Sequence, residues 1–370
     1  MFYGERIKQL REMHKLTQAA LIQNIPEITQ SQLSRIEKGR VEATEEVATL
    51  IAASTGVTVD FLTRSPDVDL RAHTPQFRAR SRVTESARNS ALQWARLIAE
   101  KFEELSGGNT LFPVGLRQLY GANPRDAAQE VRSWLGFNSD EPIHSLILDV
   151  EKVGVTVIGL PIVESNIDAF CAWREGVPTI CLLDGVPGDR LRFTAAHELG
   201  HLVLHDGQRS GQEVEREADA FAAELLTPIN SIKNEFPSKI TLSTLTMMKT
   251  SWGVSLRTLI RRARELNLID QDRAVGLYRQ ISARGWNRAE PGHVPVEKPR
   301  AFRKMAEMRY GPGPNIPLLA TEAAWSEELA SNIVDRHAKA SELPFVGPSF
   351  TRVKGENVVD FQARRAARSG

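Results

Sequence analysis

The chain has 370 residues, enough for two or three domains, and an ordinary globular composition with 41% hydrophobic and 25% charged residues. Its 47 Lys and Arg nearly balance its 46 Asp and Glu, so a bulk charge of +1 indicates no particular partner and any contact with nucleic acid must come from a local patch. We expect neither a signal peptide nor a membrane span, because the first turns are charged and no stretch approaches the ~18 apolar residues that a span needs. Two cysteines make no disulfide framework, which favours a reducing, cytoplasmic location.

The N-terminal 65 residues have the pattern of a run of short helices. Thr17 can cap a second helix, and Thr29 can cap a third helix that Gly39 can end. After two prolines in a polar stretch, a long amphipathic helix is predicted over 85–105, ending at a Ser-Gly-Gly sequence. The later pattern predicts a helix over 123–135, a strand over 155–160, a hairpin over 168–183, and helices over 189–205 and 213–226.

The sequence HELGHLVLH contains an HExxH motif at His197, Glu198 and His201. On a helix, positions i and i+4 lie on one face, so both imidazoles can reach one metal ion. Glu198 can accept a proton from water at that metal, and zinc lowers the pKa of such water from 15.7 to roughly 7. A bare HExxH also arises by chance, as a helix with two solvated or core histidines.

The following helix supplies the context that makes the motif informative. Glu217 lies between Val214 and Phe221 in helical spacing, so we expect its carboxylate to point toward the core, where it is costly unless paired or bound to a metal. Glu217 is therefore the predicted third ligand, completing a four-coordinate site with one open position. The alternatives are Glu224, on the same face, and Glu213 and Glu215, for which a solvated role near the helix start is the expected one. His205 is interpreted as a helix-end histidine or a partner of a ligand.

Together, HELGHLVLH and EREADAFAAELLTP resemble the ImmA/IrrE family of metallo-endopeptidases, from about residue 143 to 265. The resemblance implies a mixed helix-and-sheet fold related to zincin peptidases and the cleavage of a partner protein, commonly a helix-turn-helix repressor. By motif position it makes His197, His201 and Glu217 the zinc ligands and Glu198 the base. Two histidines and a carboxylate also suit manganese.

The first 65 residues resemble an XRE-type helix-turn-helix domain, whose third helix enters the major groove with its N-terminal residues at the base edges. The resemblance implies a double-stranded DNA operator as partner, and a homodimer would read paired half-sites. The module carries eight Lys or Arg and eight Asp or Glu, so its net charge is zero. A purely protein-binding role is therefore an alternative to DNA binding. The predicted contacts to bases or phosphates are Gln18, Thr29, Gln30, Ser31, Gln32 and Arg35.

Downstream arginines offer a further phosphate contact, with a solvated linker as the alternative; they are Arg71, Arg78, Arg80, Arg82 and Arg88. Either strand of the hairpin at 168–183 could bind an extended peptide by strand addition, or the hairpin could be purely structural. With the turn centred on Gly176, Cys171 and Cys181 would lie roughly opposite each other, and we interpret them as buried thiols.

The predicted fold is α+β and mainly helical, an all-α helix-turn-helix domain joined to a zincin-like metallopeptidase domain with a small sheet. Its predicted divisions are a helix-turn-helix domain (1–65), a linker and helical region (66–142), the metallopeptidase domain with C-terminal helices (143–285), and a Pro/Gly-rich, partly disordered tail with one helix near 322–337 (286–370). The predicted function is a DNA-binding regulator with a zinc endopeptidase that cleaves a repressor or antitoxin-like protein. The alternative is a transcription factor whose peptidase-like domain senses a ligand or metal without cleaving.

Overall fold

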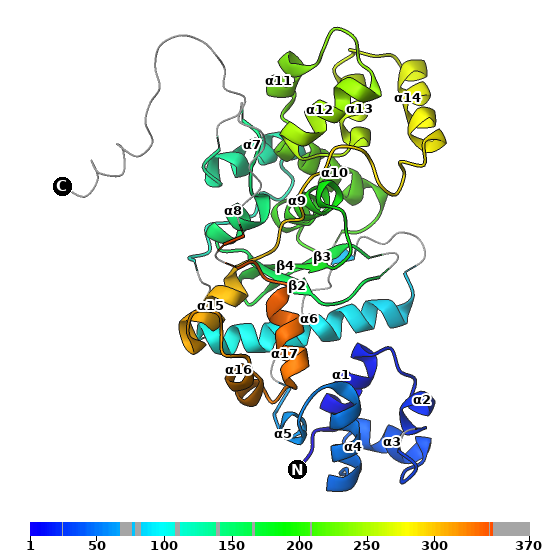
Figure 1. The fold of residues 1–370 in the computed structure, drawn as a ribbon, viewed down its shortest axis with the longest axis vertical. Helices are drawn as coiled ribbons and strands as arrows, with labels where there is room; N and C mark the ends of the chain where they lie inside the picture. Colours follow the sequence, from blue (N-terminus) through cyan, green and yellow to red (C-terminus); the bar gives the residue numbers. More distant parts are fainter. Residues whose placement is uncertain are drawn as a thin grey trace, which may run out of the picture.

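The computed structural model describes residues 1–23, 25–66, 76–77, 83–107, 112–137, 141–164, 167–207, 209–339 and 341–342. One small sheet lies between two groups of helices, so the predicted α+β, mainly helical fold is confirmed (Figure 1). Within the described residues, no helix combines the length and apolar character needed to cross a bilayer.

The first five helices lie together at one end of the molecule (Figure 1). The side chains of Thr17 and Thr29 accept backbone N–H groups at the starts of α2 and α3, which confirms both predicted caps. Gly39 follows α3 with a φ of +66°, a conformation that glycine adopts without strain and that lets the chain leave the helix. These helices are α1 (Gly4–Met13), α2 (Gln18–Ile22), α3 (Gln30–Glu37), α4 (Glu45–Thr55) and α5 (Val59–Leu62).

The sheet has four strands in the order β1-β3-β4-β2. β3 and β4 form the predicted hairpin, with Arg174 paired to Val177 across a turn in which Glu175 and Gly176 both have positive φ. β2 runs parallel to β4, and β1 pairs antiparallel with β3 at residues 170 and 171. The strands are β1 (Gln76–Phe77), β2 (Thr156–Leu160), β3 (Ala169–Arg174) and β4 (Val177–Leu183).

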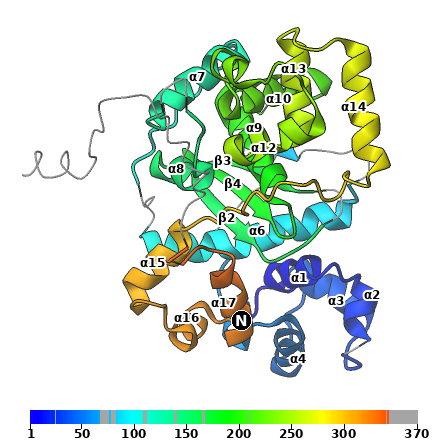
Figure 2. The same ribbon diagram turned by 45° about the horizontal axis from the view of Figure 1, so that its top comes forward.

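Each face of the sheet is covered by its own hydrophobic core. One face packs with α8 (Leu146–Lys152), α9 (Gly188–Leu204) and α10 (Gln212–Leu226). The opposite face packs with the long helix α6 (Glu85–Ser106) and helices from the end of the described chain (Figures 1 and 2). The remaining helices flank the α9 side; they are α7 (Pro124–Trp134), α11 (Ile229–Ile232), α12 (Leu242–Trp252), α13 (Leu256–Glu265) and α14 (Gln271–Ala283).

The two cysteines lie on opposite faces of the sheet, which corrects the expectation that they oppose each other. Cys171 pairs with Ile180, and Cys181 pairs with Phe170. Because the turn is formed by Glu175 and Gly176, the residue opposite Cys171 is Ile180 and not its neighbour Cys181. Neighbouring side chains on a strand point to opposite faces, so the two thiols lie on opposite sides of the sheet. Both cysteines are buried and free, as the sequence predicted.

The helix-turn-helix segment shares a core with the rest of the protein. The backbone carbonyl of Met13 accepts hydrogen bonds from Ser90 Oγ (2.7 Å) and Trp94 Nε1 (3.2 Å) of α6. On the other side, Thr58 N donates to Ala324 O at 2.9 Å. The apolar side chains of α1 and α4 belong to the same hydrophobic cluster as those of α6. The first five helices are therefore fixed against the body through a continuous core.

The prediction of an extended, partly disordered tail is wrong for residues 301–323, whereas the helix predicted near 322–337 is confirmed by α17. Residues 301–335 form three helices whose apolar side chains enter the core shared with α6. Proline does not prevent these helices. Pro317 lies in the first turn of its helix, where proline is tolerated, and Asn315 caps that helix. The helices are α15 (Ala301–Tyr310), α16 (Ile316–Ala323) and α17 (Glu327–Asp335), the last lying within the predicted helix near 322–337. Residues 343–370 lie outside the described residues.

His337 fixes the end of α17 to the sheet. Its Nδ1 lies 2.9 Å from the carbonyl of Ile333, and its Nε2 accepts the backbone N–H of Gly159 at 3.3 Å. A side chain at Gly159 would collide with the backbone of Arg336, so glycine permits this close approach. Burial lowers the pKa of His337 to about 4; the hydrogen bond to Ile333 acts to raise it, and the nearby Arg303, Lys298 and Arg336 contribute to lowering it.

We expect this histidine to make stability depend on pH. Between pH 6.5 and about 4 the unfolded chain binds a proton at His337 that the folded chain does not, so the stability present above pH 6.5 is lost as the pH falls. The loss amounts to about 3 kcal/mol at most. Denaturant unfolding at several pH values should therefore show a steeper loss for the wild type than for His337→Gln. The exposed His144→Gln should follow the wild type; equal slopes for wild type and His337→Gln would contradict the assignment.

Candidate metal centre

The HExxH residues lie in the second half of α9, the helix that packs on one face of the sheet. His197 and Glu198 are fully buried and His201 is 2% exposed. α9 is held against β3 by Trp173, whose Nε1 donates to the carbonyl of Leu202 at 2.9 Å. His197, Glu198 and His201 thus lie in a hydrophobic layer, where buried polar groups need hydrogen-bond or metal partners.

A glycine inside the motif lets the next helix approach. A Cβ on Gly200 would lie 3.0 Å from Phe221 Cδ1 and 3.3 Å from Ala218 Cα, both on α10. Any larger residue would push α10 away from α9. The close packing brings the carboxylates on one flank of α10 next to the two histidines.

Three side chains converge at this contact. His197 Nε2 and His201 Nε2 lie 3.0 Å apart. The Glu215 carboxylate lies 3.4 Å from His197 Nε2 and 3.6 Å from His201 Nε2. One donor atom from each residue lies within 4.8 Å of the others, and within the described part of the chain no other three His, Cys, Asp or Glu side chains meet in this way.

Glu217, the third ligand predicted from the sequence, is not in this group, and Glu215 lies beside the two histidines instead. The Oε2 atom of Glu217 lies 2.8 Å from His205 Nε2, and its side chain is 28% exposed, compared with 39% for Glu215. Glu215 and Glu217 lie on the two flanks of the buried face of α10, and both reach α9: Glu215 lies beside His197 and His201, whereas Glu217 contacts His205 at the end of the helix. The buried face of α10 was correctly predicted, and the flank that carries Glu215 is the one next to the two histidines of the motif.

Outer hydrogen bonds orient both imidazoles. His197 Nδ1 lies 2.9 Å from Asp219, and His201 Nδ1 lies 3.0 Å from His205 Nδ1. If His197 and His201 each carry their proton on Nδ1, His205 accepts from His201 and donates from Nε2 to Glu217. Both Nε2 lone pairs then point into the space shared with Glu215, which is the arrangement that holds metal-binding histidines in place.

The pKa values of the outer groups agree with this proton arrangement. Burial lowers the pKa of His205, which favours the neutral ring. For Glu217, burial acts to raise the pKa, but hydrogen bonds from His205 and Arg209 outweigh it and lower the pKa overall, which favours the carboxylate. A neutral His205 between His201 and an ionised Glu217 is thus the stable arrangement.

The donor set fits a divalent metal such as zinc. Ligands on one tetrahedral zinc lie about 3.3 Å from each other, and the contacts among His197, His201 and Glu215 are close to that spacing. Two imidazoles and one carboxylate leave a fourth position open, as in catalytic zinc sites.

Glu198 lies on the sheet side of the histidines, beside Cys171 of β3. Burial raises the pKa of the Cys171 thiol well above its ordinary value, and the negative charge of the Glu198 carboxylate raises it further. Cys171 therefore stays protonated beside Glu198. This contact could not be predicted from the sequence, because it depends on the register of β3 under α9.

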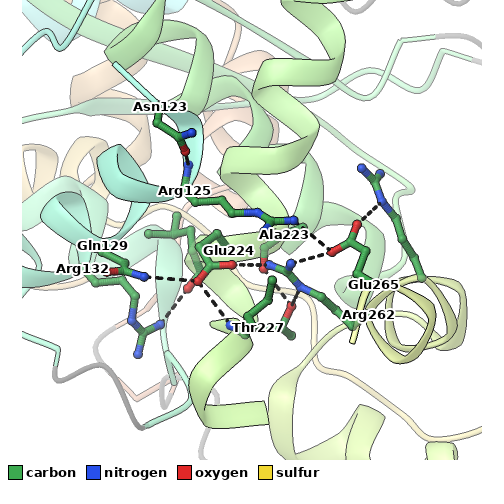
Figure 3. Close-up of polar contacts among 12 residues, drawn as sticks. Asn123, Arg125, Gln129, Arg132, Ala223, Glu224, Thr227, Arg262 and Glu265 are labelled. Atoms are coloured by element: carbon green, nitrogen blue, oxygen red, sulfur yellow. Dashed lines mark hydrogen bonds and ion pairs between the residues drawn. The ribbon is translucent and has the colours of Figure 1, made fainter. Parts of the chain in front are cut away.

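Glu224, the alternative ligand, has a structural role (Figure 3). It is 2% exposed and pairs with the buried Arg262 at 2.8 Å. Its other oxygen accepts hydrogen bonds from Gln129 and from the backbone of Ile229. Arg262 also donates to Thr227, so Glu224 joins α7, α10 and α13 instead of facing the histidines.

The strand order limits which hairpin strand could bind an extended peptide, although the sequence had left both strands open. β4 lies between β3 and β2 and has no free edge, so only β3 could receive a peptide. At residues 170 and 171 that edge already pairs with β1. An extended peptide would have to bind beyond β1 or displace it.

The predicted DNA contacts divide into two groups. Gln18 donates to Glu37 at 2.9 Å, and Thr29 and Gln32 cap α3 through reciprocal hydrogen bonds, so these three side chains support the domain itself. Gln30, Ser31 and Arg35 are exposed on α3, which lies at the outer side of the molecule while α1 lies against α6 (Figures 1 and 2). Arg88 lies on α6; Arg71, Arg78, Arg80 and Arg82 lie outside the described residues.

Comparison with known families supports both halves of this description. Residues 150–264 match the family described as IrrE N-terminal-like domain, a peptidase family, and residues 7–62 match the helix-turn-helix family. The resemblance of the chain to a fusion of these two modules is thereby confirmed. No match to a curated protein was found.

Proposed function

We propose that the protein is a DNA-binding regulator that carries a divalent-metal-dependent endopeptidase site. The observation that supports the peptidase most is the convergence of His197, His201 and Glu215 on one point, with Glu198 buried beside them. We further propose, from the family resemblance, that the substrate is a protein partner of the helix-turn-helix repressor or antitoxin type.

His197 Nε2, His201 Nε2 and the Glu215 carboxylate would hold the metal, with zinc preferred and manganese suited to the same donors. When bound, such a metal polarises a peptide carbonyl and makes water more acidic. Glu198 then receives the proton from the attacking water and passes it to the amide nitrogen that leaves. Asp219, and His205 together with Glu217, keep the two ligand imidazoles in their orientation.

The dependence on metal tests this proposal directly. We expect the zinc-loaded protein to cleave peptides in a random-sequence pool, detected as new termini by mass spectrometry. Treatment with 1,10-phenanthroline should abolish cleavage, and added zinc should restore it, because the metal supplies both the activated water and the carbonyl polarisation. Cleavage that persists in the chelated protein, or no cleavage at all by the zinc-loaded protein, would refute the proposal.

For the DNA-binding part, we propose that Gln30, Ser31 and Arg35 face the major groove and that two copies of the chain read paired half-sites. Their exposure at the start and middle of α3 supports this choice. Thr29 and Gln32 are already used in capping, and Gln18 is used in the contact with Glu37.

We expect Arg35→Ala to weaken DNA binding by roughly 10-fold, the effect of losing one good base or phosphate contact. The probe is a duplex enriched from a random-sequence library by the wild-type protein, and the measurement is fluorescence anisotropy over a series of salt concentrations. Arg284→Ala, at the end of the distant α14, is the matched control and should bind as the wild type does. Equal affinities for the two variants would exclude Arg35 from the interface.

A further inference from the structure

A cavity of about 970 Å³ adjoins the metal centre on the side of Asp219. It is bounded by the loop before α9, by α9 and α10, by α13, and by the segment 286–296. Asp219 connects the cavity to the site, since this residue lines the cavity and also contacts His197 Nδ1 at 2.9 Å. The cavity therefore lies next to the metal centre, across Asp219 from His197.

A buried hydroxyl group in the cavity wall has no internal partner. Thr194 is fully buried on α9, one turn before His197, and it lines the cavity. Among the described residues, nothing accepts or donates a hydrogen bond at its Oγ1. A buried polar atom without a partner is costly, so this position favours a ligand that supplies one.

The cavity wall is rich in positive charge. Its lining contains six Arg or Lys and three Asp or Glu. Several of these cations are already neutralised: Lys249 contacts Asp189 and Glu290, and Arg262 pairs with Glu224 and Glu265. Arg190 is held by both oxygens of Asp168, at 2.7 and 2.8 Å.

Two arginines in the wall have no carboxylate partner within the part of the chain that the structure describes. Arg257 is kept in place by a hydrogen bond of 2.7 Å to Asn287 and by its position over the Tyr278 ring, at 5.5 Å from the centroid. Arg288 follows directly after Asn287, and none of the ion pairs among the described residues includes either arginine. Both side chains are exposed and line the cavity.

We propose that this cavity binds acidic side chains of the protein substrate, with Arg257 and Arg288 as the residues that recognise them. This inference rests on the proposed peptidase function and adds the class of substrate to it. Guanidinium groups bind carboxylates through two parallel hydrogen bonds, which neutral side chains cannot reproduce. Because the cavity lies across Asp219 from His197, the acidic residue of the substrate would bind near the metal centre and not at it.

A peptide fits the space better than a small anion does. The wall combines the two arginines with the aromatic rings of Tyr278 and Trp286 and with Thr194, so it offers apolar surface and a hydroxyl group besides positive charge. A side chain with an apolar stem and a terminal carboxylate matches these three features together.

Binding can be tested without cleavage. Two pools of fluorescein-labelled decapeptides are random except for two fixed positions, which hold Glu in one pool and Gln in the other. We expect zinc-loaded Glu198→Gln protein to bind the Glu pool at least about tenfold more tightly at low ionic strength, with the preference declining as salt is added. Adding Arg257→Ala and Arg288→Ala should remove the preference, and adding Arg257→Lys and Arg288→Lys should restore part of it.

Arg264→Ala is the matched control. Arg264 lies on the same helix as Arg257 but is not part of the cavity wall, and it donates to Gln271 instead. This variant should keep the full preference for the Glu pool. No preference in the parent protein, or an unchanged preference in the double alanine variant, overturns the proposal. If the wild type still cleaves peptides in a zinc-dependent way in that case, only the acidic specificity fails; absence of all cleavage would count against the peptidase itself.

Discussion

Glu198→Gln should lose peptide cleavage by at least about 10³-fold while keeping its metal. A positioned proton acceptor contributes roughly 10²–10⁴-fold to such reactions, and glutamine has nearly the shape of glutamate but cannot take up a proton. Glu198 is fully buried and does not belong to the group formed by His197, His201 and Glu215, so the metal donors are unchanged by the substitution. The measurement is the cleavage rate of the zinc-loaded variant on peptides that the wild type cleaves, together with its zinc content.

Glu213→Gln provides the control for this experiment. It makes the same chemical change on α10, but the Glu213 side chain is 76% exposed and contacts only Arg209, at 3.8 Å, in the ion pairs of the described residues. It should cleave as the wild type does. If Glu198→Gln cleaved at the wild-type rate, the role of Glu198 would be wrong. If the regulatory effect in cells survived in Glu198→Gln, the regulator would act without cleavage, as the sensor alternative requires.

The second large effect concerns the metal itself. We expect Glu215→Ala to reduce zinc affinity by more than 100-fold, because it removes one of three donors, whereas Glu217→Ala should reduce it by only about 10-fold. The smaller effect follows because Glu217 acts through His205 on the orientation of His201, and loss of such outer partners typically costs 10–100-fold. Competition with a fluorescent zinc chelator measures both affinities.

Which of the two substitutions, Glu215→Ala or Glu217→Ala, lowers zinc affinity more decides between the two candidate ligands. If Glu217→Ala lost more affinity than Glu215→Ala, the ligand predicted from the sequence would be correct and the one indicated by the geometry would be wrong. Glu213→Gln again serves as control, and its affinity should equal that of the wild type. The double variant Glu217→Ala/His205→Ala should bind zinc about as weakly as His205→Ala alone, because Glu217 acts on His201 only through His205.

The close approach of α9 and α10 explains why the predicted and the observed third residue differ. From the sequence, the apolar residues of α10 identify its buried face. Glu217 lies between Val214 and Phe221 in helical spacing, so it was predicted to point toward that face. Which flank of that face contacts α9 depends on how the two helices cross, and the crossing is permitted by Gly200 against Phe221 and Ala218. Glu215 and Asp219, four residues apart on the same flank, are brought to the histidines by this contact.

The segment after Trp286 is a second place where the amino-acid composition did not predict the structure. Proline and glycine after Trp286 indicated an extended tail, yet Glu297 lies in the core, where it pairs with the fully buried Arg192 of α9 and accepts the backbone N–H of Ile147. A lone buried arginine in the metal helix would be strongly unfavourable, so Glu297 belongs to the support of the site. Nothing in the local sequence around Glu297 indicates a partner more than 100 residues away.

What the sequence determined by itself was local. The spacing of His197, Glu198 and His201 follows from the helical repeat, the caps at Thr17, Thr29 and Asn123 follow from side chains that satisfy helix ends, and the hairpin follows from its turn and strand residues. The tertiary structure decided everything that depends on which surfaces meet: Glu215 in place of Glu217, Cys171 under Glu198, the arginine-lined cavity beside Asp219, and the helices at 301–323. The physical reason is that a helical or strand period fixes the direction of a side chain within its own element, whereas a metal, a buried charge or a ligand selects residues by distance across elements, and those distances are set by packing.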